Sequence, residues 1–100
     1  MKPTIAAKLD QLSRRLGEIH AFLSSENATR DMDQFRRLSR EQSEITPIAD
    51  LFRQYRRTET DLAAAQDMQA DPQLKEYAES EIRTGKERLE SITQELQRLL

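Results

Sequence analysis

The amino-acid sequence predicts an all-α protein: three long helices in an antiparallel coiled-coil-like hairpin or bundle, with the second helix kinked or restarted near Pro47. Apolar residues recur every three or four positions over most of the chain, which is the spacing of one helix face. Glycine and proline are scarce, with 2 and 3 copies, and charged residues make up 34% of the 100 positions. This composition is typical of long helices with solvated outer faces, and the length suits a single domain over residues 1–100.

The first helix is predicted from a stripe of apolar residues spaced four, three, four, three and four apart. Pro3 suits its first turn, where the missing N–H is not needed. Residues 24–27, Ser-Ser-Glu-Asn, favour turns and end the pattern. The stripe consists of Ile5, Leu9, Leu12, Leu16, Ile19 and Leu23.

The second helix is predicted to start after Asp31 or Asp33, because either carboxylate can cap the first free N–H groups. Pro47 interrupts it, since proline cannot bond to the carbonyl of Ser43. The helix therefore either kinks there or restarts with Thr46 as its N-cap. The apolar spacing continues across the proline, which argues against a long loop. The apolar positions are Met32, Phe35, Leu38, Ile45, Ile48, Leu51, Phe52, Tyr55, Leu62, Ala65 and Met68.

The third helix is predicted to begin at Pro72, with Asp71 as its cap. Gly85 lies on the apolar stripe and predicts a close approach of a neighbouring helix. The short connection at residues 69–72 predicts that the second and third helices form an antiparallel hairpin, with the first helix covering its remaining apolar face. The stripe consists of Leu74, Ala78, Ile82, Gly85, Leu89, Ile92, Leu96 and Leu99.

Several classes of function are excluded by what the sequence lacks. It has no cysteine, a single histidine (His20) and two distant glycines, so neither a usual zinc site nor a phosphate-binding loop is expected. A slim helical hairpin offers no cleft for a pair of catalytic carboxylates. We therefore expect no enzyme activity, catalytic residue, metal, cofactor or small-molecule substrate. No apolar run approaches the ~20 residues of a membrane helix, so a soluble, cytoplasmic protein is expected.

Two groups of arginines are the candidate contact residues, because guanidinium groups bind phosphate and carboxylate groups through two hydrogen bonds. They could meet RNA phosphates or an acidic protein. The simpler interpretation is a solvated face balanced by Asp61, Glu41 and Glu44. Exposed aromatic residues for base stacking are not expected, since Phe22, Phe35, Phe52, Tyr55 and Tyr77 mostly follow the apolar stripes. The two groups are Arg36, Arg37 and Arg40, and Arg53, Arg56 and Arg57.

The charge is distributed unevenly along the chain. Residues 1–57 carry 11 Lys and Arg against 8 Asp and Glu, whereas residues 58–100 carry 5 against 10. Such an uneven field can orient a protein beside a charged partner, but it is too weak in the first part to indicate nucleic-acid binding.

Several segments together resemble the N-terminal domain of bacterial peptide chain release factor 1, a class I release factor. They are the opening "MKPTIAAKLDQL", the central "FRRLSREQSEI" followed by "ADLFRQY", then "ADPQLKEYAESEI" and the closing "LQRLL". No single motif is diagnostic, but their order and spacing span essentially the whole chain. Release factor 2 has a different, longer opening, which favours the first type.

The resemblance implies a longer parent protein that recognises the stop codons UAA and UAG and triggers hydrolysis of peptidyl-tRNA on the ribosome. Its codon-reading Pro-x-Thr and its Gly-Gly-Gln tripeptides belong to later domains, and neither occurs here. The chain is then expected to end at the first domain boundary and to be non-catalytic. The family's domain lies near the stalk base of the large ribosomal subunit, at its GTPase-associated centre, and is linked to release factor 3.

The residues alone leave another class of function open. A free-standing coiled-coil adaptor, which dimerises through the same apolar stripes, would show the same periodicity. Its mark would be a stable dimer in which residues 1–24 are dispensable for folding.

Overall fold

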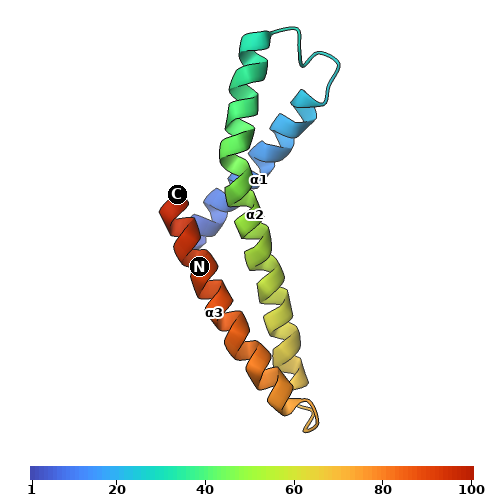
Figure 1. Cartoon of the computed structure of the whole chain (residues 1–100), viewed down its shortest axis with the longest axis vertical. Coiled ribbons are helices and arrows are strands. Elements are labelled where there is room, and N and C mark those ends of the chain that lie inside the picture. Colours follow the sequence, from blue (N-terminus) through green and yellow to red (C-terminus); the bar gives the residue numbers. More distant parts are fainter. The chain divides into compact units, whose positions relative to one another are not determined.

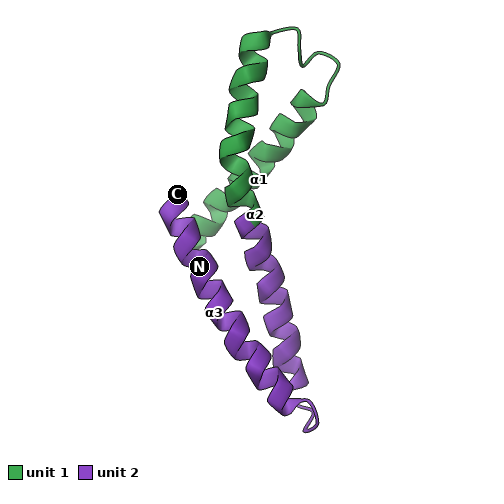
Figure 2. Ribbon diagram, in the orientation of Figure 1, with its two compact units in different colours: residues 1–50 green, residues 51–100 purple.

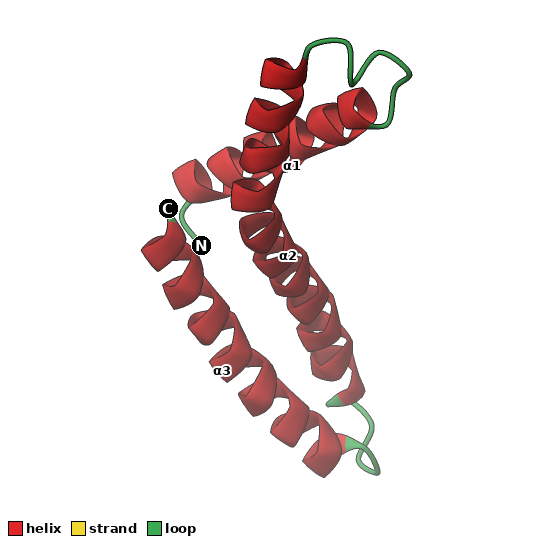
Figure 3. Cartoon of the chain, turned by 45° about the horizontal axis from the view of Figure 1, so that its top comes forward, coloured by secondary structure: helices red, strands yellow, loops and turns green.

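The computed structural model describes residues 1–100 and is all-α, as the sequence predicts. It contains three helices, α1 (Pro3–Leu23), α2 (Met32–Met68) and α3 (Lys75–Leu99), and no strand (Figures 1 and 3). None of the three combines the length and the apolar character that a membrane span requires.

The chain divides into two compact units, each a pair of helices joined by a short connection (Figure 2). Unit 1 is Met1–Asp50 and contains α1 and the first part of α2. Unit 2 is Leu51–Leu100 and contains the rest of α2 and all of α3. The prediction that the first helix covers the hairpin of the other two joins elements of different units and stays a prediction.

The ends of the helices in unit 1 follow local sequence signals. Pro3 is the first residue of α1, and the helix ends before Ser24, whose N–H donates to the carbonyl of His20 at 3.0 Å. Of the two aspartates expected to cap α2, Asp31 does so. Its Oδ1 accepts a hydrogen bond from the N–H of Gln34 at 3.1 Å, which satisfies one of the free donors at the helix start.

The core of unit 1 forms where the apolar stripe of α1 meets that of α2. Ile19 packs in one cluster with Leu38 and Ile45, and all three are buried. Partly buried apolar residues of α1 surround this cluster, namely Leu12, Leu16, Phe22 and Leu23. The predicted stripe of α1 is therefore the face that this helix buries.

Helix α2 continues through Pro47 rather than restarting at Thr46. The Thr46 hydroxyl donates backwards to the carbonyl of Gln42 at 2.7 Å instead of capping a new helix, and the Ser43 hydroxyl donates to Ser39 at 3.1 Å. Proline inside a helix and such back-bonded hydroxyls are recognised causes of helix bending. Pro47 is exposed, so its ring occupies no core space.

In unit 2 the predicted start of the third helix is wrong by three residues, since α3 begins at Lys75 and not at Pro72. The Asp71 side chain is used inside the connection, where its Oδ1 accepts from the N–H of Gln73 at 2.9 Å. The Leu74 N–H donates to the Asp71 carbonyl at 3.0 Å. An aspartate that bonds two residues ahead forms a turn, and this turn is completed before the helix starts.

The core of unit 2 lies between the second part of α2 and α3. On α2 the buried residues are Phe52, Tyr55, Thr58 and Ala65, and on α3 they are Ala78, Ile92 and Leu96. The predicted close approach at Gly85 is confirmed, because a Cβ atom there would lie 3.3 Å from Cδ1 of Leu62.

Three predicted positions in this unit are wrong. Leu74 and Leu99, at the two ends of the predicted stripe, are 40% and 43% exposed, because the stripe loses its partner at the helix ends. Tyr77 is 58% exposed. It precedes the buried Ala78 by one residue, which turns it about 100° away from the apolar stripe.

Candidate interaction surfaces

The arginines of unit 1 lie on the exposed side of α2, mostly beside acidic neighbours. Arg36 Nη1 is 3.7 Å from Oδ1 of Asp33, one turn earlier in the helix. Arg37 lies close enough to Glu41 to lower the pKa of that carboxyl. Arg40 is exposed and makes no ion pair, so its guanidinium is open to a partner.

The arginines of unit 2 are similarly engaged. Arg56 Nη1 is 3.6 Å from Oε1 of Glu59, and its guanidinium lies 4.8 Å from the centre of the Phe52 ring. Arg53 also makes an interaction. Arg57 is exposed and makes no ion pair. The structure therefore brings neither predicted group together as a row of free guanidinium groups, because pairing within one helix turn uses several of them.

Glu41 pairs with a residue that the sequence did not single out. Arg15 of α1 donates to both carboxylate oxygens of Glu41 on α2, from Nε at 2.8 Å and Nη2 at 2.9 Å. The hydrogen bonds from Arg15 hold the pKa of Glu41 below its usual range, with a smaller effect of its positive charge. Because these residues are 26 positions apart, no local pattern marks the pair.

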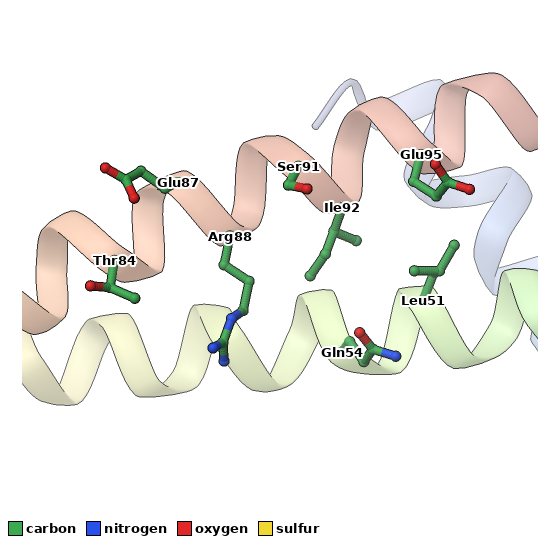
Figure 4. A pocket seen from close by; sticks show the side chains of 8 residues that line it. All are labelled: Leu51, Gln54, Thr84, Glu87, Arg88, Ser91, Ile92 and Glu95. Atoms are coloured by element: carbon green, nitrogen blue, oxygen red, sulfur yellow. The ribbon is translucent and has the colours of Figure 1, made fainter.

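A groove lies between α2 and α3 in unit 2, and the part drawn in Figure 4 has a volume of about 560 Å³. Arg88 of α3 extends across it towards α2, beside Gln54. The adjoining part of the groove is lined by Arg57 and Asp61 of α2 together with Arg88 of α3. No local sequence pattern marks Arg88, because only the pairing of the two helices puts it near Arg57. The groove is open and carries charges of both signs, so it is not a specific pocket.

The end of unit 2 where α2 passes into α3 exposes acidic and apolar side chains rather than arginines. We use "tip surface" for its exposed acidic and apolar residues. Leu74 and Tyr77 expose large apolar side chains there. The acidic charge could have been found in the sequence, but the exposure of Tyr77 could not. The members are Asp67, Asp71, Leu74, Glu76, Tyr77, Glu79 and Glu81.

No three His, Cys, Asp or Glu side chains gather in a way that could hold a metal ion. Every buried polar side-chain atom has a hydrogen-bond partner. Exposed charges and exposed apolar side chains on rigid helices can recognise another macromolecule.

Comparison with known proteins identifies the family to which this arrangement belongs. The PCRF domain matches residues 12–100. The chain belongs to the PCRF domain family. Among curated relatives of this PCRF domain, Peptide chain release factor 1 of Burkholderia multivorans is 44% identical over 100 residues, which are 100% of the chain and 28% of that protein.

Two proteins of Burkholderia cenocepacia with the same description are similar to the PCRF domain to the same degree. They are 44% and 43% identical over 100 residues, again 100% of the chain and 28% of each protein. The PCRF domain thus spans little more than a quarter of the length of these relatives. No solved structure matches it.

Proposed function

We propose that the chain acts in translation termination, as a non-catalytic N-terminal domain that helps a class I release factor to dock on the ribosome. The observation that carries this proposal is the match of the PCRF domain over residues 12–100. The relatives described as Peptide chain release factor 1, similar over the whole chain, support it. In this proposal the longer protein recognises UAA and UAG and releases the peptide in the cytoplasm, through domains other than this one.

The architecture supports a docking role. Two helix pairs, stabilised by buried apolar residues and by the Arg15–Glu41 contact, present exposed charged faces on rigid elements. Residues on such elements keep a fixed spacing, which suits contact with a large partner whose own surface is preformed. As the finer part of the proposal, we place this contact at the stalk base of the large subunit, at the GTPase-associated centre, with a functional link to release factor 3.

The predicted arginines enter this proposal as contacts to ribosomal RNA. Arg40 and Arg57, which make no ion pair, are the members best able to donate to phosphate oxygens. Arg36 and Arg56 would first have to leave Asp33 and Glu59. The proposal predicts that RNA affinity falls steeply with salt. Unchanged affinity after Arg53→Ala, Arg56→Ala and Arg57→Ala together would remove the second arginine group from it.

The docking role is tested by deleting residues 1–100 from the release factor that contains them. Codon-dependent peptide release should remain measurable, while ribosome association or recycling weakens. Complete loss of peptide release by a protein that still folds would contradict a docking role. Sedimentation of the chain itself at micromolar concentration distinguishes the adaptor alternative, which requires a stable dimer.

A further inference from the structure

Helix α2 belongs to both compact units, and the boundary between the units falls within it (Figure 2). Ile45 packs in the core of unit 1, and Phe52 is buried in unit 2. Between these two positions the only buried side chain is that of Ala49, which is a single methyl group. Ile48 and Leu51 are only half-buried. Few apolar atoms therefore fix this part of α2 against its neighbours.

The row of backbone hydrogen bonds in α2 has a gap just before this boundary. Pro47 has no N–H, so the carbonyl of Ser43 lacks the donor that a helix normally supplies four residues later. Both residues are exposed, so water can reach this carbonyl. Water that enters the row of helix hydrogen bonds is a recognised cause of bending.

Two hydroxyl groups weaken the same stretch of α2. The Ser43 hydroxyl donates to the carbonyl of Ser39 at 3.1 Å. The Thr46 hydroxyl donates to the carbonyl of Gln42 at 2.7 Å. In a helix each of these carbonyls also accepts from the backbone N–H one turn later, and a hydroxyl that competes for it slightly destabilises and bends the helix. Between residues 39 and 47, three carbonyls thus have a shared or a missing donor.

We propose that the turn from Ser43 to Pro47 is a hinge in α2, at which the helix bends in solution between more than one curvature. A bend at this point changes the distances between exposed residues on its two sides, whereas distances within each helix pair stay as they are. The same exposed residues then fit partner surfaces of more than one shape. The hinge is independent of the proposed function, because both of its consequences are measured on the 100-residue chain alone.

Hydrogen exchange of the backbone amides, followed residue by residue by NMR, measures the opening of the hinge. The amides of residues 48–51 follow the gap, and those of residues 86–89 lie in the middle of α3, which contains no proline. The first set should exchange at least about tenfold faster, because a local opening needs less free energy than global unfolding. Pro47→Ala restores the missing donor and should remove most of this difference.

The distance between two spin labels measures the bend itself. The chain has no cysteine, so labels attach only to introduced cysteines. Arg36→Cys and Gln54→Cys place labels on either side of Pro47, and Glu79→Cys and Gln97→Cys place them at the same sequence spacing in α3. All four positions are exposed, and the spacing is a whole number of turns, so both labels of a pair lie on one helix face. A bend of about 20° changes the separation of labels about 5–6 Å from the axis by about 2 Å.

The α3 pair shows what a helix without a proline gives. Its segment contains Gly85 and a back-bonded hydroxyl, from Thr93 to the carbonyl of Leu89 at 2.8 Å. Its distance distribution should nevertheless be narrow. The α2 pair should give a distribution broader by about 2 Å, and Pro47→Ala should narrow it to the width found for α3. Glu44→Ala, a change at an exposed position in the same stretch of α2, should alter neither the exchange rates nor the distribution.

Three results would each overturn the hinge. They are equally slow exchange of the amides in residues 48–51 and 86–89, equally narrow distributions for the α2 and α3 label pairs, and a broad α2 distribution that persists in Pro47→Ala. Fast exchange together with a narrow α2 distribution is an instance of the second result, since it shows local opening without a bend. None of these measurements involves a ribosome, so the proposed function stands or falls separately.

Discussion

Two glycines in the middle of helices provide a quantitative test of the packing between α2 and α3. Replacing an interior helix glycine by alanine stabilises a helix by about 1 kcal/mol, because alanine loses less conformational freedom on folding. At Gly17 of α1 a new Cβ would meet no heavy atom within 4 Å. Gly17→Ala should therefore give the whole gain, a rise in melting temperature of about 4–8 °C for a domain of this size.

The same substitution at Gly85 of α3 should not stabilise. Its Cβ would lie 3.3 Å from Cδ1 and 3.8 Å from Cβ of Leu62, closer than ordinary van der Waals contact in the first case. Leu62 must then move, and overpacking of this kind costs about 1–3 kcal/mol. Against a gain of about 1 kcal/mol from helix propensity, the net effect lies between roughly zero and ~2 kcal/mol of destabilisation.

Urea and thermal unfolding, followed by far-ultraviolet circular dichroism, measure both effects. In a Leu62→Ala background the obstructing side chain is gone, so Gly85→Ala should recover the gain of about 1 kcal/mol. The coupling between the two positions in this double-mutant cycle should exceed about 0.5 kcal/mol. Equal stabilisation by Gly17→Ala and Gly85→Ala, or additivity of Leu62→Ala and Gly85→Ala, would refute the close approach.

Three further predictions concern α2 and its contact with α1. Pro47→Ala restores a hydrogen bond to the carbonyl of Ser43 and should raise the free energy of unfolding by about 1–3 kcal/mol, measured by urea unfolding; a loss of stability would contradict the continuous helix. Arg15 lowers the pKa of Glu41, so this pair stabilises the folded state fully at pH values above the unfolded-state pKa of about 4.3. The stabilisation is lost as the pH falls through the lower pKa that Glu41 has in the folded state. Glu41→Gln should remove this component from the pH dependence of unfolding, and an unchanged acid limb would show that the pair is not formed in solution. Burial raises the pKa of Tyr55, with a further contribution from a nearby carboxylate, so stability should fall as pH rises above about 10, and absorbance titration should find this tyrosine ionising late.

Local signals in the sequence were sufficient for the helices themselves. Pro3 marks the start of α1, Asp31 caps α2, and apolar residues at three- and four-residue spacing mark the buried faces. These features depend on side chains within one or two turns of each other. The start of α3 was placed too early, because the side chain of Asp71 can cap a helix or close a turn, and its partner, the N–H of Gln73, decides between them.

The candidate surfaces were less accessible to sequence reasoning. Arg36 and Arg56 were identified as exposed cations, but their pairing with Asp33 and Glu59 depends on side-chain geometry within the helix. Arg88 and Arg57 line the same groove only because α2 and α3 run antiparallel in a particular register. The sequence pattern puts Tyr77 with the apolar stripe, but its neighbour Ala78 is the buried residue. Successive residues of a helix point about 100° apart, so Tyr77 faces away from the stripe and is exposed.

By itself the sequence determined the all-α class, the three helices, their apolar faces and the short connection between the last two. Each of these follows from helix periodicity and from the backbone preferences of single residues, which act within a few positions of the chain. Only the tertiary structure decided that Arg15 donates hydrogen bonds to Glu41 and that the Leu62 side chain packs closely against Gly85. It also decided that Leu74 and Tyr77 remain exposed beside carboxylates that form no ion pair. Such contacts depend on the register and rotation of one helix against another, which the packing of both faces sets together.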